Sequence, residues 1–271
     1  MRWIRSKRYG SAAANGAAIG GFNPSISNPK LGDTLFFNGS NWINVGSNNF
    51  DVYSKWDWDF SGIGSSNPLG FQLTKSANAI YSESDNYGVN STEKATGVGS
   101  LSTGTGTGEN IYLSRANYNV GNGSEISIKW RGALEDLSDG TNTYYIYKGL
   151  IKPASLPAGA TDPNDGIYFK YSHGINGGKY FAVTRAASTS TETDTGVAAD
   201  NQYHVFEIRF NTDLSTVTFF IDGVQVASHT TNIPTAGIYS LIMGIWQTAG
   251  ASARKIHFDL YGEFIYNANG R

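Results

Sequence analysis

Residues 203–227 read YHVFEIRFNTDLSTVTFFIDGVQVA, and this stretch decides the fold. Apolar and polar residues alternate over 204–210, as they do in a strand with one buried face and one solvated face. The polar cluster at 211–215 and the Asp222-Gly223 dipeptide both favour tight turns. We therefore expect strands at 204–210, 215–221 and 224–229, joined by two successive hairpins.

The same alternation continues in both directions from this stretch. It predicts further strands at 56–60, 109–115, 125–131, 143–150, 166–171, 179–185, 239–246 and 255–260. The glycine- and threonine-rich runs at 97–108 and 188–195 are interpreted as loops. So many half-buried antiparallel strands in one chain predict an all-β protein, built as an antiparallel β-sandwich of the jelly-roll type.

The composition agrees with this fold class and excludes several functions. The chain holds 33 Gly, 28 Ser, 22 Thr and 24 Asn among 271 residues, and these residues favour turns over helices. With no cysteine, disulfides, thiolate metal sites and cysteine nucleophiles are excluded. A net charge of −2 gives no overall basic field for nucleic acid, and the apolar runs are too short for a transmembrane helix.

The first 46 residues differ from the rest and are expected to form a separate attachment device. Residues 1–30 have the composition of an extended arm, which is either a disordered terminus or a segment that orders on a partner. Two short apolar runs follow at 31–37 and 42–45, and Asn38-Gly39 between them predicts a hairpin. An isolated hairpin is marginal in water, so its aromatic residues should pack on something larger. The residues expected to attach are Arg2, Trp3, Arg5, Lys7, Arg8, Phe36, Phe37 and Trp42.

The segments 203–210, 215–227 and 232–234 together resemble the concanavalin A-like lectin/glucanase and laminin G domains. The likeness rests on an arginine-bearing strand followed by a strand that reads apolar-apolar-x-Asp-Gly-x-x-apolar. It spans 115–266, is clearest over 203–266, and implies a jelly roll of two packed antiparallel sheets. We expect the jelly-roll domain to occupy residues 47–271.

Residues 31–45, LGDTLFFNGSNWINV, are similar to a Gly-Asp-x-Leu-x-x-x-x-Gly-x-x-Trp-x-Asn element that recurs in phage tail-fibre and other virion surface proteins. Followed by a lectin-like sandwich, this element implies a virion fibre or capsid decoration protein. The resemblance also implies a homotrimer, although the sequence contains no heptad stalk.

Catalytic residues are hard to find in this sequence. A glycosidase needs two carboxylates about 5–5.5 Å or 6.5–9.5 Å apart. Asp259 and Glu263 would lie about 13 Å apart on an extended strand. Asp57 and Asp59 are closer, about 7 Å along the strand, but alternate with Trp56, Trp58 and Phe60 and should be solvated. We therefore expect no catalytic pair and no enzyme activity.

Metal and cofactor sites are also not expected. The four histidines at 173, 204, 229 and 257 show no zinc-type spacing, and His204 falls in the apolar set of its strand. Asp162, Asn164 and Asp165 precede Gly166 and faintly resemble a calcium loop, but their spacing is irregular and a plain turn is favoured.

Sugar binding remains as the hypothesis for a site. It needs aromatic faces beside amide or carboxylate groups, and several expected strands and their loops supply both. The alternative is that the tyrosines are ordinary half-buried sheet residues. The candidate residues are Tyr144, Tyr145, Tyr147, Tyr168, Tyr171, Asp139, Asn142, Asn164 and Asn176.

The sequence thus predicts a non-enzymatic virion surface protein. Residues 1–46 would bind other virion proteins, and the jelly roll would contact a host-surface glycan or stabilise the particle. The alternative is a secreted lectin or glycoside hydrolase of the same fold. Neither nucleic acid nor membrane insertion is expected.

Overall fold

The computed structural model describes residues 34–37, 42–45, 52–57, 71–84, 98–121, 123–153, 161–172, 176–234 and 237–267. The side chains described are those of residues 71–82, 98–115, 118–121, 123, 125–153, 161–172, 177–234 and 237–258. The extended arm predicted for 1–30, with Arg2, Trp3, Arg5, Lys7 and Arg8, lies outside these ranges. No helix in the described residues is long and apolar enough to cross a membrane.

The chain divides into two compact units, 1–51 with 268–271 and 52–267. In the first unit, β1 (Thr34–Phe37) pairs antiparallel with β2 (Trp42–Val45), so that Phe37 faces Trp42 across the ladder. The hairpin predicted around Asn38-Gly39 is therefore confirmed by its strand pairing.

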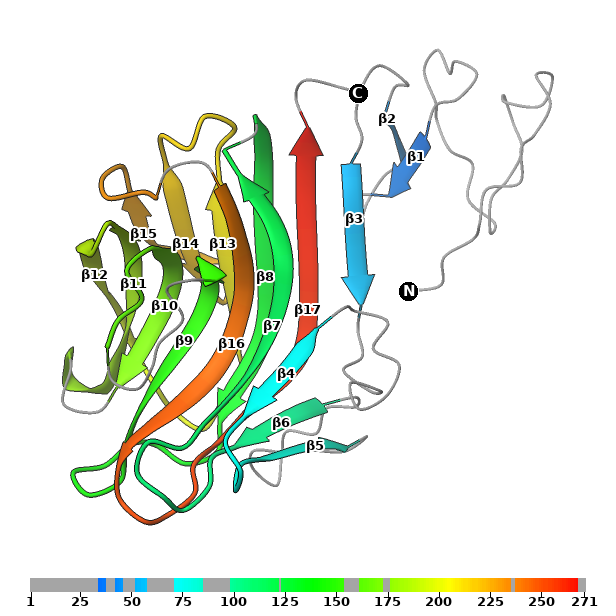
Figure 1. The fold of residues 1–271 in the computed structure, drawn as a ribbon. Coiled ribbons are helices and arrows are strands. Elements are labelled where there is room, and N and C mark those ends of the chain that lie inside the picture. Colours follow the sequence, from blue (N-terminus) through cyan, green and yellow to red (C-terminus); the bar gives the residue numbers. More distant parts are fainter. Residues whose placement is uncertain are drawn as a thin grey trace. The chain divides into compact units, whose positions relative to one another are not determined.

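The second unit is a sandwich of two antiparallel sheets (Figure 1). The seven-stranded sheet has the order β12 (Thr189–Ala198), β11 (Lys179–Ala186), β10 (Gly166–Ser172), β9 (Thr143–Ile151), β16 (Gly237–Ala249), β7 (Asn110–Val120) and β4 (Gln72–Lys75). A single 3₁₀ turn, Asn176–Gly178, precedes β11.

The eight-stranded sheet packs against the first. Its order is β15 (Val224–His229), β14 (Val217–Ile221), β13 (His204–Phe210), β8 (Ser124–Leu134), β17 (Lys255–Asn267), β6 (Val98–Ser102) and β5 (Ile80–Ser84), and β3 (Val52–Asp57) also pairs with β17. The all-β antiparallel sandwich predicted from the alternation is confirmed.

The core between the sheets is aromatic. Trp130 on β8 stacks on Phe206 of β13 with ring centroids 5.9 Å apart, and Phe169 on β10 packs edge-on against both rings. On these strands the predicted alternation holds, since Ile126 and Ile128 are buried together with Trp130. Such packing supplies most of the stability of a sandwich.

Two predicted loops are wrong in part. Within the run at 97–108, residues Val98–Ser102 form β6, whose Val98 and Leu101 are fully buried, whereas 103–108 lie in a loop as predicted. Within the run at 188–195, residues 189–195 belong to the edge strand β12. Threonine hydroxyls on β12 form hydrogen bonds with neighbouring strands. The Thr193 hydroxyl hydrogen-bonds to Nε2 of His229 on β15, and the Thr195 hydroxyl donates to the Tyr180 carbonyl. Such a strand lacks the alternation of apolar and polar residues from which the other strands are predicted.

His204 was expected with the core residues, but the structure places it at the rim of the sandwich. Its Nδ1 lies 2.6 Å from Asp222 Oδ2 and its Nε2 lies 2.9 Å from Asp200 Oδ1. The ring still borders Phe206, at 6.3 Å between centroids. Its two polar contacts explain why it stands at the start of β13 and not deep between the sheets.

Candidate functional site

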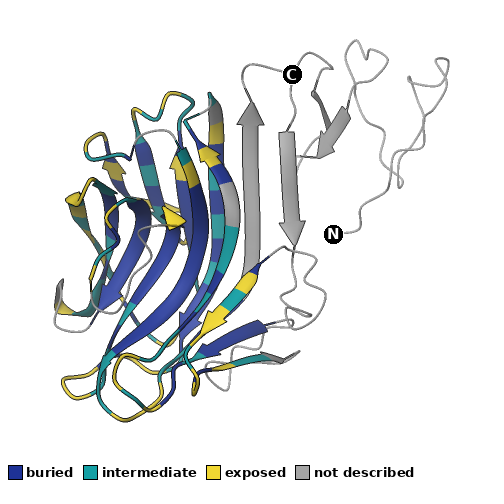
Figure 2. Cartoon of the chain, in the orientation of Figure 1, coloured by how far each residue is buried: buried dark blue, intermediate teal, exposed yellow. Residues whose placement is uncertain are grey.

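The outer face of the seven-stranded sheet, the face turned away from the partner sheet, is buried where a free sheet face would be solvated. All seven residues of β10 are buried, and so are most of β9 and β16 (Figure 2). Strand alternation sends every second side chain of these strands outward. A second apolar cluster, separate from the core, therefore lies on this outer face.

Six aromatic rings from five strands form this cluster, and we call them the aromatic floor. They are Tyr112, Tyr145, Tyr147, Tyr168, Phe181 and Trp246. Trp246 stacks on Tyr112 with centroids 5.5 Å apart and meets Tyr147 edge-on at 5.3 Å. Tyr145 stacks on Tyr147 at 6.1 Å. The contacts make one continuous aromatic cluster across neighbouring strands, in which Tyr147, Tyr168 and Trp246 are buried and Tyr112, Tyr145 and Phe181 are partly exposed.

Glycines give these rings room to lie against the sheet. A Cβ at Gly244 would stand 2.3 Å from the Tyr112 Cβ and 2.8 Å from the Trp246 ring. A Cβ at Gly166 would stand 2.9 Å from the Tyr168 ring. Both rings thus lie over backbone that carries no side chain.

A row of charged side chains borders the aromatic floor, and we call it the polar row: Asp162, Lys170, Arg185 and Glu192. Lys170 Nζ lies 2.9 Å from Asp162 Oδ2 and 3.2 Å from Glu192 Oε2. Arg185 lies 3.6 Å from the same Asp162 oxygen. Asp162 belongs to the segment between β9 and β10, so this segment reaches over the outer face at that residue.

The floor and the row meet at Tyr147, whose hydroxyl donates to Asp162 Oδ1 at 2.9 Å. Burial, followed by the charge of Asp162, raises the pKa of Tyr147 and of Tyr168 above the usual range of a phenol. Both hydroxyls therefore keep their protons and act as donors. In the described part of the chain, Tyr168 Oη and Arg185 Nε are buried and have no hydrogen-bond partner.

The two carboxylates of the polar row have a spacing that is relevant to glycoside hydrolysis. Both contact the same ammonium nitrogen, so their nearest oxygens are at most about 6 Å apart, close to the separations of glycosidase pairs. Each of these carboxylates is engaged in an ion pair with the shared Lys170 ammonium. In this arrangement the pair is suited to hydrogen-bonding a ligand.

The predicted tyrosines divide between the two faces of the sheet. Tyr145, Tyr147 and Tyr168 lie in the aromatic floor. Tyr144 and Tyr171 face the interior of the sandwich, where the Tyr144 hydroxyl donates to the Asp136 carbonyl and the Tyr171 hydroxyl accepts from the Ser138 amide. A sugar cannot reach a ring between two packed sheets, so these two tyrosines belong to the core.

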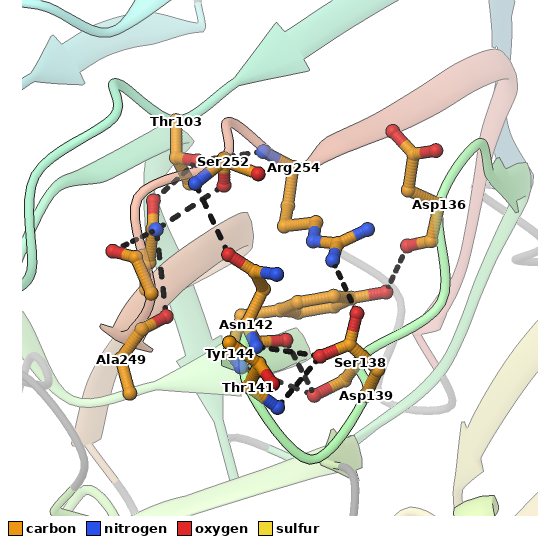
Figure 3. A network of polar contacts seen from close by, with 12 residues as sticks. Thr103, Asp136, Ser138, Asp139, Thr141, Asn142, Tyr144, Ala249, Ser252 and Arg254 are labelled. Carbon is orange, nitrogen blue, oxygen red and sulfur yellow. Dashed lines mark hydrogen bonds and ion pairs between the residues drawn. The ribbon is translucent and has the colours of Figure 1, made fainter.

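Asp139 and Asn142 lie in a network of loops (Figure 3). Asp139 accepts from the Thr141 and Asn142 amides and from Arg254, and the two backbone hydrogen bonds are the main reason that its pKa falls to about 2. Asn142 Oδ1 accepts from the Ser252 amide. These contacts tie the loop between β8 and β9 to the loop between β16 and β17, away from the floor.

The three residues that faintly resemble a calcium loop each contact different partners. Asp162 belongs to the polar row, Asn164 Oδ1 accepts from Ser188 Oγ, and Asp165 Oδ1 accepts from the Ala187 amide. Within the described side chains, no group of three His, Asp or Glu residues is placed to hold a metal ion.

Several predicted residues lie outside the described side chains. They are Phe36, Phe37 and Trp42 of the hairpin, Asn176, and the acidic residues Asp57, Asp59, Asp259 and Glu263.

Sequence reasoning missed six of the ten site residues, namely Tyr112, Phe181 and Trp246 of the floor and Lys170, Arg185 and Glu192 of the row. One signal was available, because each of these residues except Glu192 stands at an alternate position of an expected strand. Alternation sorts a strand into two faces, but it cannot tell which face is inner when both are buried.

This fold and this face together define a concanavalin A-like sandwich with an aromatic and charged outer surface on its seven-stranded sheet. Residues 94–259 match the family model SO2946-like, C-terminal domain, and the chain belongs to this family. No curated protein matches the chain.

Two solved structures illustrate the likeness. A protein of unknown function, SO2946 from Shewanella oneidensis MR-1, has a TM-score of 0.54 and 17% identity over 81% of this chain and 89% of that chain. The alginate lyase AlyC3, solved with dimannuronate, has a TM-score of 0.50 and 10% identity over 66% of this chain and 80% of that chain. At these identities the likeness concerns the fold alone.

Proposed function

We propose that the protein binds a carbohydrate polymer on the outer face of its seven-stranded sheet. The observation that supports this most directly is the aromatic floor, whose rings Tyr112, Tyr145 and Phe181 are partly exposed and which is bordered by the polar row. Sugar rings present apolar C–H faces and hydroxyl edges, so a site for them combines aromatic surfaces with polar groups that converge from one side.

Tyr145 offers the sharpest test, because it is only partly buried and its ring stacks on Tyr147 at the side of the floor. For a polysaccharide that the parent protein binds, we expect Tyr145→Ala to weaken the affinity by about tenfold, since an aromatic contact contributes about 0.5–1.5 kcal/mol in addition to the burial of its apolar area. The measurement is affinity electrophoresis against a panel of neutral and acidic polysaccharides, followed by calorimetry on those that retard the protein.

The matched control is Phe220→Ala, which removes a partly buried aromatic ring from the other sheet, where it packs under Arg209. This variant should bind as the parent does. Equal loss in both variants, or no loss in Tyr145→Ala, would show that the aromatic floor is not the binding surface.

A second candidate function is hydrolysis, and the separation of Asp162 and Glu192 is the observation that favours it. Release of reducing ends from any polysaccharide of the panel without formation of an unsaturated uronate, abolished by Glu192→Gln, would identify a glycoside hydrolase. Retention of intact polymer favours the lectin-like function.

We also propose, from the sequence of residues 31–45, that the sandwich is carried on a virion as a fibre or decoration protein. Residues 1–46 would bind other virion proteins, the chain would form a trimer, and the sandwich would contact host-surface glycan or stabilise the particle. The alternative is a secreted protein with the same sandwich. Deletion of residues 1–30 should abolish incorporation into particles, and normal incorporation would refute the attachment role.

A further inference from the structure

The carboxylate of Asp162 is held by an unusually complete set of donors. The Tyr147 hydroxyl donates to Oδ1 at 2.9 Å, and Lys170 Nζ and Arg185 approach Oδ2 at 2.9 Å and 3.6 Å. Two cations and a phenol converging on one carboxylate make a charge-assisted anion site. The three donors stand on strands β9, β10 and β11, whereas their anion comes from the segment between β9 and β10.

The donors on this face outnumber their acceptors. Besides the groups that bind Asp162, the Tyr168 hydroxyl and Arg185 Nε are buried on the same face and have no hydrogen-bond partner in the part of the chain that the structure describes. An unsatisfied buried donor costs about 1–3 kcal/mol, so a face that keeps two of them is suited to a ligand that brings acceptors.

Charge points to the kind of ligand. With Asp162 in place, Lys170 and Arg185 are balanced by Asp162 and Glu192. If Asp162 moves away, two cations face one carboxylate, beside a floor suited to sugar rings. A sugar ring bearing a carboxylate would supply both the anion and the stacking surface.

We propose that this face recognises a uronic acid unit of an acidic polysaccharide, and that Asp162 occupies the place of the sugar carboxylate until the polymer displaces it. This inference rests on the proposed carbohydrate binding and adds both the ligand class and a self-blocking contact. Asp162 and the sugar carboxylate would compete for the same donors, so the contact of Asp162 with these donors lowers the apparent affinity for the ligand.

The test compares Asp162→Asn with the parent. Asparagine has the shape of aspartate and can still accept from Tyr147, and Lys170 retains Glu192, so the sandwich should fold. The probes are polygalacturonate and polymannuronate, each paired with its carboxyl-reduced form. We expect Asp162→Asn to bind a uronate polymer about tenfold more tightly than the parent, within the usual range for two competing contacts. Affinity for the carboxyl-reduced forms should not change.

The charge-matched control is Asp213→Asn, which removes an exposed carboxylate from the turn between β13 and β14. It should leave every affinity unchanged. Equal binding of the charged and carboxyl-reduced polymers, in parent and Asp162→Asn alike, would overturn the uronate assignment while leaving carbohydrate binding intact. Absence of binding to every polysaccharide in both proteins would overturn the inference and the proposed function together.

Discussion

At the scale of single residues, Lys148 is an ionisable side chain buried at a cost in stability. It points into the core between the sheets, is fully buried, and its Nζ has no hydrogen-bond partner among the described residues. Its surroundings are aromatic, with the Phe206 and Phe258 ring centroids 4.5 Å and 5.6 Å from Nζ. Burial in this environment lowers the pKa of Lys148 from 10.5 to about 7.

This shift makes stability depend on pH with a definite sign. Between pH 7 and 10.5 the unfolded chain holds a proton on this lysine and the folded chain largely does not. Stability contributed by this group therefore rises with pH across that window and is lowest below pH 7. We expect Lys148→Met to raise the free energy of unfolding at pH 7 by about 2–4 kcal/mol, because methionine fills a similar volume without a charge.

Urea unfolding at pH 7 and at pH 9.5 measures both effects. The gain from Lys148→Met should shrink at the higher pH. Lys179→Met serves as the control, because Lys179 is 40% exposed and its ion pair with Asp194 should contribute less than about 1 kcal/mol. A destabilised Lys148→Met protein with an unchanged pH dependence would mean that the cation–π contacts outweigh the cost of burial.

At the scale of single strands, Gly244 of β16 leaves the space that the Trp246 ring of the aromatic floor occupies. A Cβ at Gly244 would overlap both the Tyr112 Cβ and the Trp246 ring. We expect Gly244→Ala to displace the Trp246 ring, to lower the free energy of unfolding by about 1–3 kcal/mol and to weaken polysaccharide binding. Thermal unfolding and affinity electrophoresis measure the two effects.

Gly140→Ala is the matched control, because a Cβ there has nothing within 4 Å. It should leave stability within about 0.5 kcal/mol and binding unchanged. If Gly244→Ala also left both unchanged, the close approach of the Trp246 ring to the backbone at residue 244 would not matter for the site.

The strands also show how far the sequence leads. Alternating apolar residues identified β8 and β13 with the correct buried face, because Ile126, Ile128 and Phe206 pack on one side only. Edge strand β12 escaped prediction, since its partners are hydroxyl and imidazole groups and not apolar side chains. Its alternating threonines at 189, 191, 193 and 195 were a usable signal, as β-branched residues favour strands.

The site was less predictable than the fold. Tyr147 could be named from its strand, but Lys170 and Trp246 join it only through the strand order β10-β9-β16, which brings together residues about a hundred positions apart. Local patterns do not specify strand order, and nothing in the sequence near Asp162 shows that its carboxylate faces Lys170. The chemistry of the site is therefore a property of the tertiary structure.

At the scale of the whole molecule, the division into two compact units makes a prediction about assembly. In the part of the chain that the structure describes, the strands of the sandwich pair with one another within 52–267, so a chain starting at residue 52 should fold and bind polysaccharide with the affinity of the full chain. Residues 1–46 are the segment proposed for attachment, and they should carry the contacts between copies. We therefore expect a trimer for the full chain and a monomer for residues 52–271, measured by light scattering. A trimer that persists without residues 1–51 would place the contacts between copies on the sandwich, and a monomeric full chain would favour a free lectin or hydrolase over a virion protein.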